Sequence, residues 1–256
     1  METQDREEFY VGYQPRAPHR LGAFLRRAAM GLLGLTAVVA AVLVFGQGRF
    51  AASYFEFGTV REYVGVLHES PYPFLNVAVE GAGGALPAFI PYALVAEGKR
   101  GADELVRGFD GKRVKLRGTL IHRDELRMIE VVGGSLQPVG ADAAGDETKE
   151  VVLGSHTLAG EIVDSKCYLG VMNPGQAKPH RECAVRCISG GVPPLFVATD
   201  STGRALQLWL VSASGEPVNR QVLDLVAEPI EIAGEVRRAN DRLYLRADPA
   251  RFRRLN

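Results

Sequence analysis

The spacing of hydrophobic and polar positions changes once along the chain, near residue 54. Before that point, residues 28–46 form a run of nineteen without a charged side chain, in which Thr36 is the only polar side chain. At about 1.5 Å per residue, such a run spans the roughly 30 Å hydrocarbon core of a bilayer. The pattern predicts a transmembrane helix over 28–47, preceded by a tail at 1–27.

After residue 54 the hydrophobic residues alternate in short runs that Gly and Pro interrupt, which is typical of strands and tight turns. Two runs, 114–123 and 230–238, each contain a glycine at the same place, and each is followed by a second short strand, at 126–131 and 243–246. An opening segment precedes each run, at Gly58 and at Gly160. The pattern therefore predicts an internal repeat.

A polar, small and acidic segment at 139–150 is expected to link the repeats, which gives domains at 57–138 and 151–256. Each has the length of a small barrel, and a glycine inside a strand helps such a sheet to close. The predicted fold is mainly β: one transmembrane helix followed by two tandem OB-like barrels. A β-sandwich is the alternative. A helix is expected at 102–109, and a strand containing Trp209 is expected to pair with 195–199.

The second repeat is expected to carry an insertion that contains every cysteine. The matched glycines are 102 residues apart at the openings and 116 apart in the later strands, so the second half gains about fourteen residues. The gain falls in a cysteine and histidine loop at 164–194. Insertions on a scaffold often carry function.

A short helix is predicted at 179–188, with a proline in its first turn and a Gly-Gly pair at its end. On this helix His180, Cys183 and Cys187 have the spacing i, i+3 and i+7, which places them on one face. Cys167, expected at the end of the preceding strand, can complete the set. Three thiols and one imidazole suit tetrahedral zinc and also copper, while an iron–sulfur cluster is a further option.

Two alternatives to a metal site remain open. Exported cysteines usually pair, so Cys167 can form a disulfide with Cys183 or Cys187 that staples the loop and leaves one thiol over. Cys183 or Cys187 can instead act as a nucleophile with His180 as its base. The sequence assigns no catalytic residue beyond this hypothesis. His68, His122 and His156 are isolated and are not predicted to be ligands.

Charge and motifs exclude several classes of protein. The 30 basic and 30 acidic residues balance, which argues against a nucleic-acid partner. The sequence contains no nucleotide-binding motif, no C-x-x-C-H stretch for c-type haem and no C-x-x-C redox motif. Seven arginines lie within 237–254. A solvated strand face is the expected reason for them, with an anionic headgroup or an acidic subunit as the alternative partner.

The basic residues around the apolar run predict its orientation. Four arginines lie in the segment 16–27 directly before the run, whereas the first fifteen residues after it contain two. By the positive-inside rule the N-terminus is cytoplasmic, and the C-terminal domains are then periplasmic on a single-pass protein of a bacterial inner membrane. A cleaved signal peptide is the competing interpretation. The arginines are Arg16, Arg20, Arg26 and Arg27 before the run, and Arg49 and Arg61 after it.

The cysteine segment contains three linked patterns: D-x-x-C-Y, H-x-x-C-x-x-x-C and G-x-P-x-x-F. Over about forty residues it resembles a motif of mostly uncharacterised bacterial exported or membrane-anchored proteins, and this resemblance implies no activity. A looser similarity is to the haem chaperone of cytochrome c maturation. That family attaches haem through a histidine near its C-terminus, which has no counterpart here. The motif residues are Asp164, Cys167, Tyr168, His180, Cys183, Cys187, Gly191, Pro193 and Phe196.

These patterns favour a non-enzymatic binding or assembly module, held in the lipid bilayer, whose second barrel carries a metal or cofactor site. A membrane protein partner is expected, and an accessory subunit of a redox or respiratory complex fits the anchor and the thiols. The alternatives are a thiol-dependent periplasmic oxidoreductase and a structural subunit with a disulfide-stapled loop.

Overall fold

The computed structural model describes residues 18–47, 53–79, 88–140, 150–199, 205–239 and 241–255. The chain forms two compact units, residues 1–51 and residues 52–256. Most of the expected tail and most of the expected linker lie outside the described residues.

The described part of the first unit is a single helix, α1 (His19–Gln47). It begins nine residues before the predicted span, and its side chains are almost all exposed. The helix is long and apolar enough to cross a membrane, a criterion that an N-terminal signal sequence also meets.

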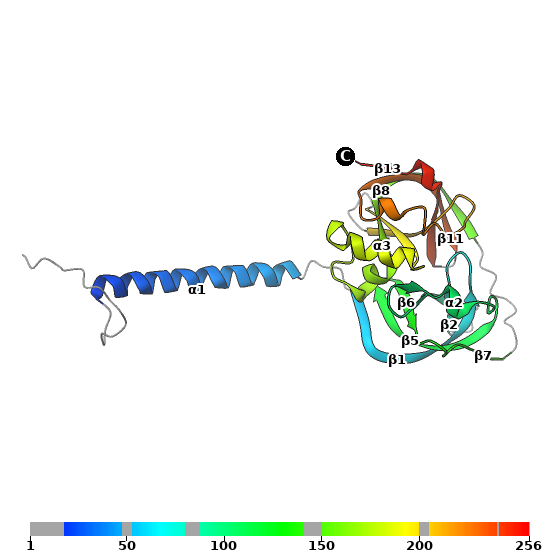
Figure 1. Ribbon diagram of the computed structural model, residues 1–256, viewed down its shortest axis with the longest axis horizontal. Coiled ribbons are helices and arrows are strands. Elements are labelled where there is room, and N and C mark those ends of the chain that lie inside the picture. Colours follow the sequence, from blue (N-terminus) through cyan, green and yellow to red (C-terminus); the bar gives the residue numbers. More distant parts are fainter. Residues whose placement is uncertain are drawn as a thin grey trace, which may run out of the picture. The chain divides into compact units, whose positions relative to one another are not determined.

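The first sheet of the second unit closes into a barrel of five strands in the order β1-β2-β3-β6-β5 (Figure 1). Closure comes from the antiparallel pairing of β1 with β5, while β3 and β6 pair in parallel. A short helix, α2 (Asp103–Val106), follows β4 and covers half of the span predicted for it. The strands are β1 (Ser53–His68), β2 (Phe74–Val79), β3 (Ala88–Ala96), β4 (Arg100–Gly101), β5 (Arg113–Arg123), β6 (Leu126–Val131) and β7 (Gln137–Pro138).

The second sheet repeats this arrangement in the order β8-β9-β10-β12-β11, and β8 pairs with β11 to close it. The parallel pair is again the third strand with the fifth, β10 with β12. The prediction of two OB-like barrels is therefore confirmed, and closure distinguishes them from an open sandwich. The strands are β8 (Glu150–Asp164), β9 (Pro194–Thr199), β10 (Ala205–Val211), β11 (Ile230–Ala239), β12 (Arg242–Arg246) and β13 (Arg253–Arg254).

The two strand glycines have the same role in both barrels. A Cβ atom on Gly118 would lie 2.5 Å from the carbonyl oxygen of Glu130, and one on Gly234 would lie 2.6 Å from that of Arg246. Any larger residue would push the neighbouring strand away at this point. Both glycines therefore allow the close strand approach that the sequence pattern predicted.

The pairing of Gly58 with Gly160 as equivalent openings was wrong. Gly65 pairs with Val114 in the first barrel, and Gly160 pairs with Ile230 in the second. The partners Val114 and Ile230 are 116 residues apart, which is also the separation of Gly118 and Gly234. Gly65 is therefore the counterpart of Gly160. The reason is an irregularity in β1, whose register against β5 shifts between residues 55 and 60.

This correction also enlarges the insertion. In the first barrel Val66 pairs with Asn76, which is ten residues later in the chain. At the equivalent position of the second barrel Glu161 pairs with Val197, which is 36 residues later. The connection between β8 and β9 is therefore 26 residues longer than its counterpart, not fourteen. It contains a π-helical turn η2 (Cys167–Val171), a 3₁₀ turn η3 (Lys178–His180) and α3 (Arg181–Ser189).

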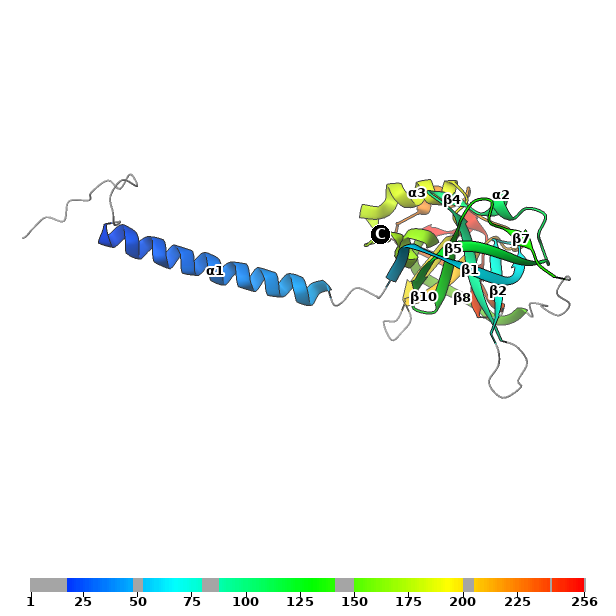
Figure 2. The same ribbon diagram turned by 90° about the horizontal axis from the view of Figure 1, so that it is seen from below.

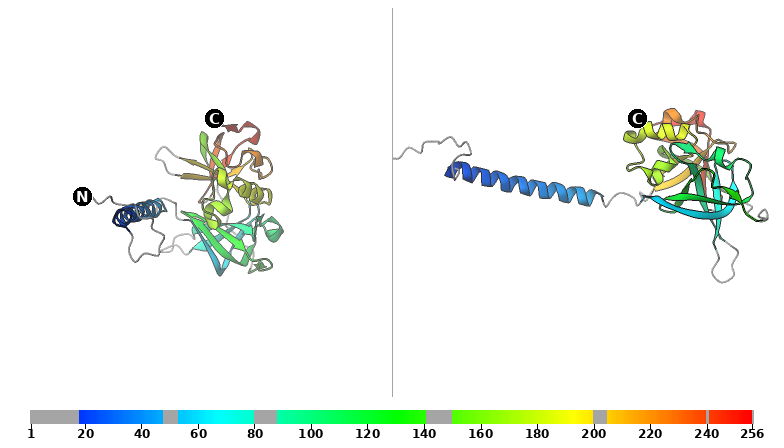
Figure 3. Two further views of the ribbon diagram at one scale, coloured as in Figure 1. Left: turned by 60° about the vertical axis from the view of Figure 1, so that its left-hand side comes forward. Right: turned by 60° about the horizontal axis from the view of Figure 1, so that its bottom comes forward.

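The barrels lie side by side (Figure 3), and both contribute to one hydrophobic cluster between them. Phe74 of β2 meets Trp209 of β10 edge to face, with ring centroids 5.1 Å apart. Trp209 pairs with Leu195 across the hairpin that the sequence predicted. The buried hydroxyl of Tyr72 donates a hydrogen bond to the carbonyl oxygen of Leu210 at 2.6 Å, which joins the barrels through a polar contact as well.

Candidate metal centre

The insertion brings all three cysteines and one histidine together. Potential ligand atoms of Cys167, His180 and Cys183 lie within 4.8 Å of one another, and so do those of Asp164, Cys167 and Cys187. Cys167 belongs to both groups and is therefore the centre of the cluster. Only Cys183 is partly exposed; the other four side chains are buried.

Local structure explains why these side chains converge. Helix α3 and the turn before it place the histidine and two cysteines at the predicted spacing, and the predicted helix at 179–188 is confirmed. Cys167 does not lie at the end of a strand, as expected, because β8 ends at Asp164 and the chain turns into η2. The turn points the chain back toward α3, which lies alongside β8 and β4 (Figure 2).

Asp164 orients two members of the cluster and was not among the predicted ligands. It is fully buried; its Oδ1 accepts a hydrogen bond from the backbone N–H of Cys167 at 2.8 Å, and its Oδ2 lies 2.9 Å from Nε2 of His180. In the tautomer that donates from Nε2, the lone pair of His180 is on Nδ1, where it can bind a metal. The D-x-x-C spacing could have indicated this role of Asp164, because an Asp side chain often accepts a hydrogen bond from the backbone N–H of the residue three positions later.

A second residue that the sequence did not reveal is Lys99, which comes from the first barrel. Its Nζ donates a hydrogen bond to Sγ of Cys183 at 3.0 Å, and this bond raises the pKa of Lys99. The lysine lies in the turn between β3 and β4. No pattern connects two residues that are 84 positions apart.

Cys167 and Cys187 are the two buried thiols of the cluster. A hydrogen bond between Cys167 and Cys187 lowers the pKa of Cys187, because the donated S–H stabilises its thiolate. The same bond, together with burial, raises the pKa of Cys167. Negative charge is therefore favoured on Cys187, and a thiolate is the form of cysteine that binds metals.

All three cysteines are free thiols in this structure. The sulfur atoms of Cys167 and Cys183 are 4.0 Å apart, about twice the length of a disulfide bond. The disulfide considered from the sequence thus remains a prediction for oxidising conditions.

A buried lysine secures the insertion to the first barrel. Lys166 is 3% exposed; its Nζ forms an ion pair with Glu130 and donates to the carbonyl oxygens of Ala96 at 2.9 Å and Gly98 at 2.6 Å. Gly98 is the neighbour of the lysine that reaches Cys183. Lys166 therefore fixes the turn that contains Cys167 relative to the turn that contains Lys99.

The isolated histidines lie apart from this cluster. Among the described residues, neither group of potential ligands includes His68, His122 or His156. His122 stacks on Tyr54 instead, with ring centroids 5.3 Å apart. No protein-family model matches the chain, and a comparison with curated proteins finds none that matches it.

Proposed function

We propose that the protein is a membrane-anchored module that binds one thiophilic metal ion, zinc or copper, through Cys167, His180, Cys183 and Cys187. The distance between two sulfurs supports this most directly. Tetrahedral zinc with bonds of about 2.3 Å separates its sulfur ligands by about 3.8 Å. The sulfurs of Cys167 and Cys183 are 4.0 Å apart with the imidazole in the same group.

The surroundings also suit a metal ion. Both oxygens of Asp164 already have partners, so this carboxylate is better placed to orient His180 and Cys167 than to act as a ligand. Bound zinc would hold the insertion to its barrel, whereas bound copper would in addition carry one electron. The apolar helix fits the wider proposal: a single-pass inner-membrane protein with its barrels in the periplasm, serving as an accessory subunit of a redox or respiratory complex.

The first experiment is a metal and thiol count on intact protein purified in detergent without chelator or reductant. We expect about one metal ion per chain by elemental mass spectrometry, or one equivalent of Zn²⁺ or Cu⁺ taken up after reduction. Cys183→Ser and His180→Ala should abolish binding. His156→Ala, which changes an exposed histidine outside the cluster, should keep it. Failure of the reduced wild type to take up either ion would refute the proposal.

A second candidate function rests on the contact of Lys99 with Cys183. A partly exposed thiol beside an ammonium group is the setting of a reactive cysteine, and Cys167 is close enough to resolve a mixed disulfide. A thiol-dependent oxidoreductase would show rapid alkylation of Cys183, slowed several-fold in Lys99→Gln. Bound metal that protects Cys183 from alkylation would favour the metal-binding module instead.

A further inference from the structure

The arginine-rich run near the C-terminus contains one arginine that is buried but has no acidic partner among the described residues. Arg242 is 4% exposed, and its Nε donates a hydrogen bond to the carbonyl oxygen of Ala239 at 3.5 Å. Within the described part of the chain it forms no ion pair. Five of the other arginines do: Arg237 with Glu150 and Glu235, Arg246 with Glu150, Arg251 with Asp248, Arg253 with Glu231, and Arg254 with Asp224.

Aromatic rings compensate part of the cost of burying this charge. The guanidinium carbon of Arg242 lies 4.4 Å from the ring centroid of Phe74 and 5.9 Å from that of Tyr244. Such contacts stabilise a cation without neutralising it. A buried guanidinium without a carboxylate is unfavourable, and an external anion can supply the missing charge.

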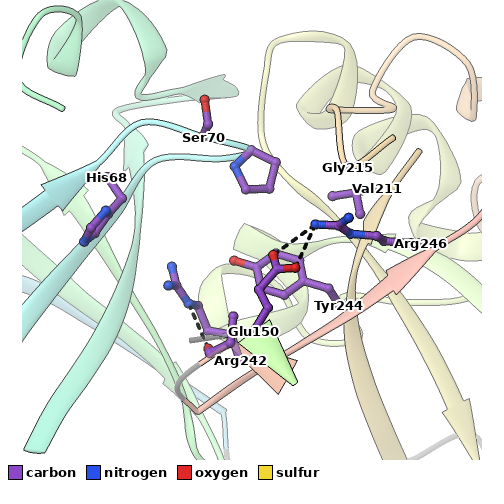
Figure 4. Close-up of a pocket in the computed structure, with 10 residues that line it drawn as sticks. His68, Ser70, Glu150, Val211, Gly215, Arg242, Tyr244 and Arg246 are labelled. Carbon is purple, nitrogen blue, oxygen red and sulfur yellow. Dashed lines mark hydrogen bonds and ion pairs between the residues drawn. The ribbon is translucent and has the colours of Figure 1, made fainter. Parts of the chain in front are cut away.

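A cavity is present where such an anion would bind. It has a volume of about 270 Å³ and lies between the barrels, with Arg242 in its wall (Figure 4). Arg242, Tyr244 and Arg246 alternate along β12, so their side chains project from one face of the strand. Ser70 and Pro71, from the loop between β1 and β2, line the opposite side.

The charge and the donors in the wall of this cavity match an oxyanion. The carboxylate of Glu150 is held by Arg246 at 3.0 Å and by Arg237 at 2.9 Å, so it is already neutralised from two sides. Burial raises the pKa of Tyr244, which keeps its hydroxyl protonated and able to donate. Arg242 thus contributes an uncompensated positive charge next to a hydroxyl donor.

We propose that this cavity binds a small molecule through a phosphate or carboxylate group that pairs with Arg242. A guanidinium presents two parallel N–H groups that match the oxygens of either anion. The group can come from a free metabolite or from the phosphate of an anionic lipid headgroup, since both offer the same oxygens. This site is separate from the cysteine cluster and does not depend on the proposed metal.

The test uses the full chain in detergent, with inorganic phosphate, succinate and short-chain phosphatidylglycerol as probes at constant ionic strength. Calorimetry should show saturable binding of at least one probe. The single tryptophan, Trp209, should report the same event by fluorescence, because its ring contacts Phe74, on which Arg242 lies. Binding only of the phospholipid would assign the lipid source, and binding of phosphate or succinate the free one.

Two variants separate a ligand role for Arg242 from a structural one. Arg242→Gln should weaken binding about tenfold or more, as expected for the loss of a charge-assisted hydrogen bond. Arg251→Gln, an exposed arginine outside the cavity, should stay within about twofold of wild type. If Arg242→Gln does not fold, Tyr244→Phe provides the comparison and should weaken binding several-fold. The absence of saturable binding by wild type, or wild-type affinity in a folded Arg242→Gln or in Tyr244→Phe, would overturn the proposal.

Discussion

Replacing Asp164 with Asn tests whether a buried carboxylate sets the tautomer of His180. The backbone N–H of Cys167 can only donate, so the Asn oxygen must stay on that side. The amide NH₂ then faces Nε2 of His180, 2.9 Å away in the native contact. Two donors cannot share that contact, so Nε2 must give up its proton and accept. The proton moves to Nδ1, the nitrogen that the proposed metal needs.

The expected magnitudes follow from the two contacts. Loss of an outer carboxylate partner of a ligating histidine lowers metal affinity about 10–100-fold, or roughly 1.4–2.8 kcal/mol. In the metal-free protein a charged hydrogen bond to His180 is replaced by a neutral one, which costs about 1 kcal/mol. For a unit of about 200 residues, a loss of that size lowers Tm by roughly 2–4 °C.

The assay is competition for Zn²⁺ with a chromophoric chelator, together with thermal unfolding of the metal-free protein. Asp110→Asn is the matched control, because Oδ1 of Asp110 also accepts a backbone N–H at 2.9 Å but lies in the first barrel. It should leave zinc affinity unchanged. If Asp164→Asn binds zinc as tightly as wild type while its Tm falls, Asp164 is structural and does not orient a ligand.

Three further changes test how the second unit holds together. Tyr72→Phe removes a buried hydrogen bond between the barrels and should lower the free energy of unfolding in urea by about 1–3 kcal/mol. The control Tyr54→Phe changes an exposed tyrosine and should lower it by less than about 0.5 kcal/mol. Lys166→Met leaves the carboxylate of Glu130 without its ion-pair partner and should lower the free energy of unfolding by about 3–5 kcal/mol. The double variant with Glu130→Leu should regain most of that stability. A double variant no more stable than Lys166→Met would contradict a buried ion pair. Burial raises the pKa of Glu161, so its contribution to stability is present below its ordinary value of 4.5 and is lost as pH rises through the folded-state value. Glu161→Gln cannot ionise and should not lose stability in this way, so the Tm difference between the variant and wild type should change as pH rises. A Tm difference that is the same at every pH would argue against this role of Glu161.

The local pattern of the chain was enough to locate most of the secondary structure. Alternating hydrophobic residues identified β5 and β6 of the first barrel and β11 and β12 of the second, because each strand buries one face regardless of its partner. No prediction covered β2 or β3. The proline and glycine signals located α3, and the spacing over α3 and the turn before it gathered a histidine and two cysteines on one face. These features depend on residues within one turn or one strand of each other.

The remainder depends on contacts between distant segments, which a single sequence does not record. Lys99 reaches Cys183 only because the first barrel packs against the insertion, and the register that equates Gly65 with Gly160 exists only between paired strands. Arg242 looked like one of seven similar arginines until packing buried it beside Phe74 without a carboxylate. The sequence specifies the chemistry of each side chain. Whether a charged side chain has a partner of opposite charge depends on neighbours that only folding brings within a few ångströms.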